Sequence, residues 1–405
     1  MNVPAEMIAP ISDRRAYRMT SIDILRGLVI VVMALDHVRD NVMLGSMQDP
    51  TADPHTGPLL FATRWITHFC APTFVFLAGV SAGLMAQRKS SSHLARFLLL
   101  RGLWLIAVEV LVISTAASFA PLGLADLGGR TYVGLQVIWA IGASMVVLAG
   151  AQFLGPCACL AIGVVIVFGH NLLDAVWPAP GSAGNPAPLW IVLHARKVFD
   201  AGPFSIYFSY PLLPWIGVMF VGYGAAGLFQ QPPKRRDEWL LWMGMGLVLG
   251  FVVIRALNIY GDPHPWHWDP SNDAATLMSF LATTKYPPSL LYLLMTLGPA
   301  AILCAFAERW RGGITNVLVT FGRAPLAFYV AHLYVIHTAA ILLGISQGFA
   351  ARQFLTQYRY YPSGYGVRLG GVYLIWIAVV AILYPFCRWV ASVKARRTDW
   401  WLSYV

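Results

Sequence analysis

Residues 21–40 read SIDILRGLVIVVMALDHVRD, an apolar run of membrane-spanning length that also carries charged side chains. The chain of 405 residues is 58% hydrophobic and only 11% charged, whereas soluble domains carry about 25% charged residues. The sequence therefore predicts an all-α fold: a polytopic helical membrane protein with about ten transmembrane helices. We place these helices at 22–44, 62–86, 96–118, 131–151, 157–176, 206–229, 239–260, 289–307, 322–346 and 369–391.

Basic residues in the short loops set the expected orientation, because cytoplasmic loops are enriched in lysine and arginine. With ten helices, every basic cluster lies on one side of the membrane, including those around Arg15, Arg88, Arg235, Arg309 and Arg396. We therefore expect both termini in the cytoplasm and the longer loops on the opposite side. The expected organisation is a cytoplasmic N-terminal segment, a transmembrane domain and a cytoplasmic C-terminal tail, at 1–21, 22–391 and 392–405.

The composition also excludes other classes of protein. The long continuous apolar runs do not alternate with period two, as the strands of an outer-membrane barrel do. The net charge of +10 does not indicate nucleic-acid binding, because the basic residues lie between apolar segments. The five cysteines form neither a disulfide framework nor a zinc spacing. We accordingly expect no nucleic-acid partner and no metal.

The first predicted helix carries an unusual set of ionisable residues. Asp23, Arg26 and His37 lie at offsets of three and eleven, so they share roughly one helical face. Asp36, Arg39 and Asp40 follow at its outer end. Charged residues at bilayer depth are costly and usually face a partner or a wet cavity. Two interpretations remain open. The side chains could reach the two membrane interfaces, or they could line a polar cleft. The presence of several ionisable residues on one helical face favours the cleft.

Further polar residues lie in other predicted helices. Arg64 and His68 are four apart near the outer end of the second helix, and Lys285 and Tyr286 precede the eighth. In the ninth, His332 and His337 are five apart and diverge by about 140°, so we expect one of them to face the site of His37. We expect the first, second and ninth helices to enclose one polar cavity. Arg323 lies near the cytoplasmic end, where snorkelling explains it equally well.

Several sequence blocks resemble a known family. SIDILRGLVIVVMALDH at 21–37, RWITHFCAPTFVFLAG at 64–79, KYPPSLLYLLMTLGPA at 285–300 and FGRAPLAFYVAHLYVIH at 321–337 resemble the membrane catalytic domain of heparan-α-glucosaminide N-acetyltransferase and its bacterial relatives. The pair Arg26 and His37 also resembles a larger group of bacterial membrane acyltransferases that modify surface glycans.

This resemblance implies an integral enzyme of the bacterial inner membrane. It would move an acyl group, expected to be acetyl, from cytoplasmic acyl-CoA to a glycan or small-molecule acceptor across the membrane. The acyl-CoA is a co-substrate, and membrane lipid and a homodimer are further expected partners. We assign catalysis to His37, as general base or acyl carrier, with Asp36 and His68. The expected substrate-binding residues are Asp23, Arg26, Arg39, Asp40, Arg64, Lys285, Tyr286, Arg323, His332 and His337.

Two alternatives stay open. In the lysosomal member of the family, the catalytic histidine lies in the first luminal segment, and His55 is the approximate match here. His55 is therefore the alternative catalytic residue. A transporter or channel for a small polar or lipid-linked molecule could use the same intramembrane charges. The spacing of Arg26 and His37 and the lack of a sequence repeat favour the enzyme.

Overall fold

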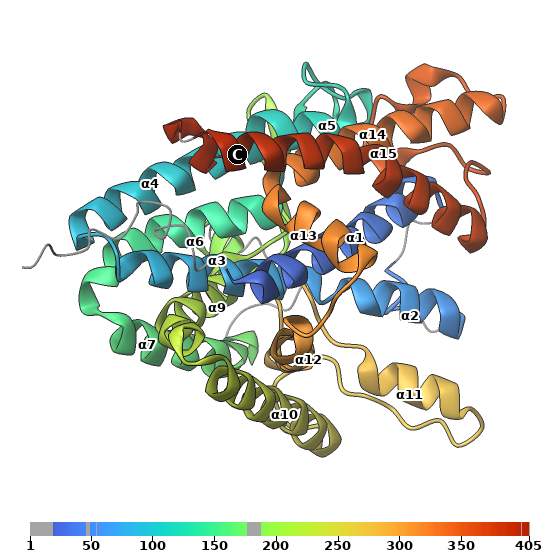
Figure 1. Cartoon of the computed structure of the whole chain (residues 1–405). Helices are drawn as coiled ribbons and strands as arrows, with labels where there is room; N and C mark the ends of the chain where they lie inside the picture. The colour runs from blue at the N-terminus through green and yellow to red at the C-terminus, as the bar shows by residue number, and fades with distance from the viewer. Residues whose placement is uncertain (1–18, 46–48, 54, 176–187, 398, 405) are drawn as a thin grey trace, which may run out of the picture.

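The computed structural model describes residues 19–45, 49–53, 55–175, 188–397 and 399–404 (Figure 1). Within these ranges, nine helical segments are long and apolar enough to cross a membrane. Their helices are α2 (Pro58–Thr67) with α3 (Cys70–Ala86), α4 (Ser91–Val108) with α5 (Ser114–Ser118), α6 (Val137–Ala151), α7 (Pro156–Gly169), α9 (Leu212–Gly224), α10 (Pro233–Leu257), α12 (Leu290–Ala307), α14 (Pro325–Ser346) and α15 (Leu369–Arg396).

The remaining long helix is α1 (Thr20–Val42), which corresponds to the first predicted helix. It has a similar length but carries five charged residues, so its composition alone does not mark it as membrane-spanning. Together these segments confirm the predicted polytopic helical membrane protein. The short helices α8 (Pro188–Leu193), α11 (Asp273–Leu281) and α13 (Gly313–Arg323) lie between them. Most of the predicted N-terminal segment, 1–18, lies outside the described residues.

Helix α1 runs through the middle of the bundle, with α13 packed against it (Figure 1). Fifteen of its 23 residues are buried, including charged ones. The two helices approach to backbone contact through a pair of glycines. A Cβ atom on Gly27 would lie 1.9 Å from the Leu318 carbonyl oxygen, and one on Gly322 would lie 1.9 Å from the Asp23 carbonyl oxygen. This contact fixes the position of α1 in its N-terminal half.

The second predicted helix is broken near its N-terminal end. Helix α2 ends at Thr67 and α3 begins at Cys70, with Pro72 in the first turn of α3. Proline fits the first turn of a helix, where its missing N–H leaves no hydrogen bond unmade. The Tyr292 hydroxyl donates to the His68 carbonyl at 2.7 Å and so satisfies a backbone group at the break. The break lets both α2 and α3 contribute side chains to one cavity.

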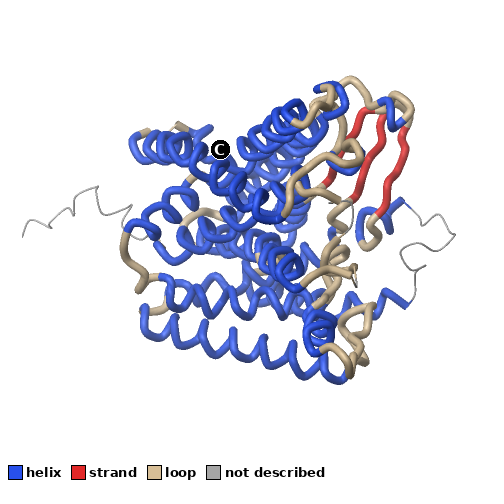
Figure 2. Tube along the Cα trace, turned by 90° about the vertical axis from the view of Figure 1, so that its right-hand side faces the viewer, coloured by secondary structure: helices blue, strands red, loops and turns tan. Residues whose placement is uncertain are grey.

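A small sheet was not predicted. Its strands are β1 (Thr131–Leu135), β2 (Lys197–Ala201) and β3 (Phe204–Phe208), in the order β1-β3-β2, with β1 parallel and β2 antiparallel to β3. Figure 2 shows them together at one edge of the helical bundle. The predicted helices 131–151 and 206–229 were therefore wrong in their first residues, where the β-branched and aromatic side chains of TYVGL and FSIYF favour strands.

Two buried charges have structural roles. Glu109 lies in the π-helical segment Glu109–Ile113, and its carboxylate accepts from the Trp139 backbone N–H at 2.8 Å, in the first turn of α6. Arg255, near the end of α10, donates to four backbone carbonyls of the following loop and α11, at 2.6–3.0 Å. The Glu109 carboxyl group satisfies a backbone N–H in the first turn of α6. Arg255 holds the segment that follows α10 against the bundle.

Candidate active site

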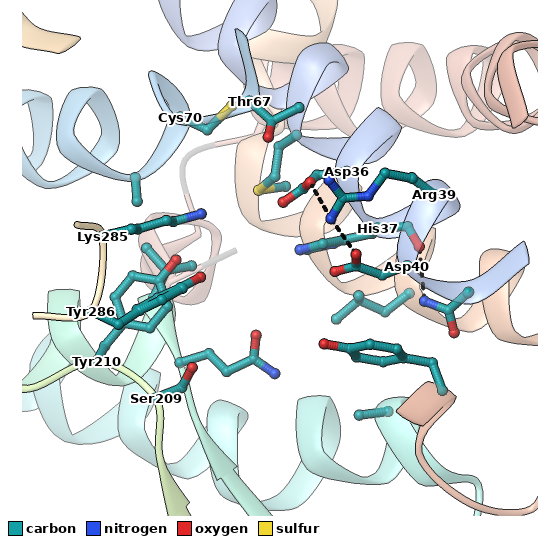
Figure 3. A pocket seen from close by; sticks show the side chains of 18 of the residues that line it. Asp36, His37, Arg39, Asp40, Thr67, Cys70, Ser209, Tyr210, Lys285 and Tyr286 are labelled. Atoms are coloured by element: carbon teal, nitrogen blue, oxygen red, sulfur yellow. Dashed lines mark hydrogen bonds and ion pairs between the residues drawn. The ribbon is translucent and has the colours of Figure 1, made fainter. Parts of the chain in front are cut away.

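A polar cavity of about 150 Å³ lies where α1, α2, α3 and α14 meet the sheet and the segment before α12 (Figure 3). The C-terminal half of α1 supplies Asp36, His37, Arg39 and Asp40. The opposite wall is formed mainly by hydroxyl-bearing and cationic side chains, namely Tyr132, Arg196, Tyr207, Ser209, Tyr210, Lys285 and Tyr286. The cavity therefore brings together residues that are distant in sequence.

The hydrogen bonds of His37 define which of its nitrogens is free. His37 Nδ1 lies 2.7 Å from His332 Nε2, and His332 Nδ1 lies 3.1 Å from the Phe328 carbonyl oxygen. A carbonyl only accepts, so His332 carries its proton on Nδ1, and its Nε2 accepts from the His37 Nδ1–H. In neutral His37 the lone pair is then on Nε2. Figure 3 shows the imidazole of His37 extending into the cavity.

An ion-pair network surrounds His37 on α1. The Arg39 guanidinium lies 3.1 Å from Asp36 and also pairs with Asp40. Arg64 on α2 pairs with Asp36 and lies 2.9 Å from Asp49. Burial raises the pKa of Asp49, but the charge and hydrogen bonds of Arg64 outweigh it and hold that pKa well below its usual range. The three carboxylates are thus held by two arginines, and they fix the geometry of this wall.

The opposite wall carries two cations that take no part in that network. Lys285 is 8% exposed, and its ammonium forms no ion pair or hydrogen bond with the residues that the structure describes. It lies 5.2 Å from the ring centroid of Tyr286, and the Arg196 guanidinium lies 4.4 Å from the same centroid. Burial raises the pKa of the Tyr286 phenol, but Lys285, Arg64 and Arg196 together lower it below its usual value. This wall is positively charged and rich in hydroxyl groups.

A second, largely apolar cavity of about 580 Å³ lies toward the other end of α1. Its apolar lining includes Ile30, Leu98 and Ile141. Four cations also line it: Arg26, Arg101, Arg323 and Lys394. Arg26 donates to Ser81 Oγ at 2.6 Å and to the Leu77 carbonyl at 3.3 Å, so its guanidinium is held on α3. The positive side chains lie at the end of the bundle that we expect to face the cytoplasm.

The histidines predicted for the site do not all lie at the polar cavity. His332 contacts His37, whereas His337 bonds to the carbonyls of Ala116 and Phe354 at 2.9 and 2.7 Å, so one of the pair reaches the site. His68 is 1% exposed and packs against Tyr292, and it does not line the polar cavity. His55 is exposed in the loop after α1 and lies outside both cavities.

The charged residues predicted for the site fall into two groups. Asp36, Arg39, Asp40 and Arg64 line the polar cavity together with Lys285 and Tyr286. Asp23 lies 3.7 Å from Arg323 near the other end of α1, and Arg26 and Arg323 line the apolar cavity. The single cleft expected along one face of the first helix is therefore two cavities, one at each end.

Sequence reasoning missed several lining residues. These residues lie in the strands or directly beside them, and no local pattern connects β1 with β3: Tyr132, Arg196, Tyr207, Ser209 and Tyr210. Tyr329 lines both cavities, and its spacing of three from His332 places both on one side of α14. That spacing was a signal for Tyr329 in the sequence.

The chain also matches a known protein family. The family model "Heparan-alpha-glucosaminide N-acetyltransferase, catalytic" matches residues 18–261, more than half of the chain. This match includes α1 with Arg26 and His37, and it ends before Lys285, Tyr329 and His332. No curated protein matches the chain significantly. The match confirms the resemblance seen in the sequence, and the chain belongs to the heparan-α-glucosaminide N-acetyltransferase catalytic family of membrane acetyltransferases.

Proposed function

We propose that this protein moves an acetyl or other acyl group from cytoplasmic acyl-CoA to a hydroxyl or amine acceptor on the opposite side of a bacterial inner membrane. The observation that carries the proposal is the pair of cavities at the two ends of α1, with His37 in the polar one and Tyr329 between them. One cavity has the character of a donor site and the other that of an acceptor site. Family membership supports the reaction class.

The apolar cavity suits the donor. Pantetheine is a slender chain, and an apolar cavity with a few polar groups is the usual form of a small-molecule site. The guanidinium groups of Arg26, Arg101 and Arg323 provide partners for coenzyme A phosphates at the cytoplasmic end. The thioester would then approach His37 through the boundary that the two cavities share.

His37 provides the proton transfer. In a direct reaction, Nε2 of neutral His37 takes the proton of the acceptor O–H or N–H while that atom attacks the thioester carbon. The C–S bond breaks, and the thiolate receives a proton, giving acylated acceptor and CoA–SH. In a two-step reaction, Nε2 attacks the thioester carbon and the C–S bond breaks, which gives an acyl-imidazolium and the CoA thiolate. The acceptor oxygen or nitrogen then attacks the acyl carbon, the bond to Nε2 breaks, and the acceptor's proton passes through Nε2 to the thiolate, giving CoA–SH. In both, His332 orients the ring through the hydrogen bond to His37 Nδ1, and Asp36 and Asp40 lie beside His37 in the same cavity.

The polar wall suits the acceptor. Tyrosine rings with their hydroxyl groups offer stacking surfaces and hydrogen bonds, and Ser209, Lys285 and Arg196 add further polar contacts. This combination fits a hydroxyl-rich molecule such as a sugar. The acceptor class is therefore a glycan or a small polar molecule.

A reconstituted system tests the function against the transporter alternative. Full-length protein in liposomes is given acetyl-CoA labelled in the acetyl group, with native envelope glycans as the acceptor pool. We expect CoA thiol release that matches acetyl incorporation into the acceptor. Accumulation of label inside the vesicles without thiol release would contradict the enzyme and support transport. Arg26→Ala should raise the KM for acetyl-CoA, whereas Lys234→Ala on the exposed start of α10 is the matched control.

A further inference from the structure

The two cavities share three lining residues. Phe74 from α3, Val137 at the start of α6 and Tyr329 from α14 line both the polar and the apolar cavity. All other lining residues belong to one cavity alone. Because the three shared side chains come from three different helices, they form a boundary across the bundle between the two spaces.

Tyr329 is the polar member of this boundary and lies against the histidine pair. Its ring centroid is 6.3 Å from that of His37 and 5.4 Å from that of His332, with edge-on geometry in both contacts. Tyr329 is 4% exposed, and its hydroxyl makes no hydrogen bond with the described part of the chain. Packing therefore holds the ring in place, and no hydrogen bond ties it there.

The boundary separates two different environments. On one side the lining is mainly apolar with a basic end, and on the other it is polar and ionic. A thioester that stays on the apolar side is kept from the polar cavity, where water can reach His37. Exclusion of water is a recognised means of preventing hydrolysis of a reactive group.

We propose that Tyr329, with Phe74 and Val137, forms a partition that limits the size of the acyl group reaching His37 and shields the thioester from water. This inference rests on the proposed acyl transfer and adds a specificity determinant to it. When the partition is breached, water replaces the acceptor: acyl-CoA and water give the free acid and CoA–SH. Longer acyl chains also gain access to His37.

The test compares variants of the full-length protein with acetyl-, butyryl- and octanoyl-CoA. Tyr329→Ala should raise the activity on octanoyl-CoA relative to acetyl-CoA at least about tenfold, since a hydrophobic pocket discriminates one methylene by about 10- to 200-fold. It should also release thiol several-fold faster than wild type without an acceptor. Tyr329→Phe should behave as wild type in both assays, because it keeps the ring.

Two further variants keep the test decisive. Tyr334→Ala removes a tyrosine from the same helix that lines neither cavity, and its chain-length preference should not change. Val137→Ala is a milder change at the partition and should shift both readouts in the same direction as Tyr329→Ala, but less. Val137→Ala provides the test of the partition if Tyr329→Ala does not fold.

The outcomes separate this inference from the proposed function. Wild-type transfer with unchanged chain-length preference and unchanged hydrolysis in Tyr329→Ala and Val137→Ala would overturn the partition and leave the acyltransferase intact. A shift equally large in Tyr334→Ala would also overturn it. Absence of thiol release from every acyl-CoA in wild type would instead contradict the proposed function itself.

Discussion

His37 takes its chemical character from a residue 295 positions away in the chain. Because the Phe328 carbonyl fixes the proton of His332, the free nitrogen of His332 accepts from His37 and leaves the cavity-facing nitrogen of His37 as the base. His332 is fully buried and lines neither cavity. In the proposed reaction it is therefore a positioning residue, whereas His37 is the residue that meets the reacting atoms.

At this residue scale, His332→Ala should lower kcat by about 10²-fold, because a small misplacement of a catalytic group costs that much. The KM for acetyl-CoA should change little, since His332 does not touch the donor. His332→Asn should recover part of the activity, because its amide oxygen accepts from the His37 Nδ1–H. Steady-state kinetics of the three proteins check this. Equal losses in both variants, or a loss confined to KM, would contradict the positioning role.

At the element scale, the position of α1 is set by packing against α13. The two glycines that allow backbone contact, Gly27 and Gly322, place Arg26 at the apolar cavity and His37 at the polar one. The broken α2–α3 segment then presents Arg64 to Asp36. Helix packing and the break together build the site.

Gly27→Ala tests this packing. Its Cβ would meet the Leu318 carbonyl oxygen at 1.9 Å, and overpacking of this kind costs about 1–3 kcal/mol or more. We expect a lower thermal unfolding temperature in detergent, measured by scanning fluorimetry. Gly246→Ala on α10, where a new Cβ meets nothing within 4 Å, is the control and should be neutral or stabilising by up to about 1 kcal/mol. Equal unfolding temperatures for Gly27→Ala and wild type would contradict the close α1–α13 contact.

The sequence predicted the long helices of the fold but not its strands. The apolar helices were predictable because continuous hydrophobic runs of membrane-spanning length have one common explanation. The strands were not, since β1 and β3 are five residues each and about 70 positions apart, and their pairing has no local signal. The cavity residues on α1 lie in one predicted helix and were predicted. Those in and beside the strands depend on the strand pairing and were not predicted.

At the scale of the whole molecule, the two cavities lie at opposite ends of α1 and differ in character. The cavity with the four cations lies where the basic loops predict the cytoplasm, and the polar cavity lies at the other end. The sequence predicted one cleft, and the structure divides it at Tyr329. A donor and an acceptor can thus approach His37 from opposite sides.

Cysteine labelling in a cysteine-free background checks this orientation. Arg235→Cys, at the start of α10, should react only with a membrane-permeant maleimide, because positive loops stay in the cytoplasm. Ala195→Cys, in the loop before β2, should react with an impermeant reagent added outside intact cells. The reverse labelling pattern would contradict the predicted topology with both termini in the cytoplasm.

Acetyl transfer by His37→Ala in the reconstituted system tests the catalytic role of His37 most directly. Loss of the general base or acyl carrier should lower transfer by about 10²–10⁴-fold while folding is unchanged, as judged by the thermal unfolding temperature. His267→Ala, an exposed histidine in the loop before α11, is the control and should retain wild-type transfer. Wild-type transfer by folded His37→Ala protein would contradict the assignment and move the catalytic role to His55.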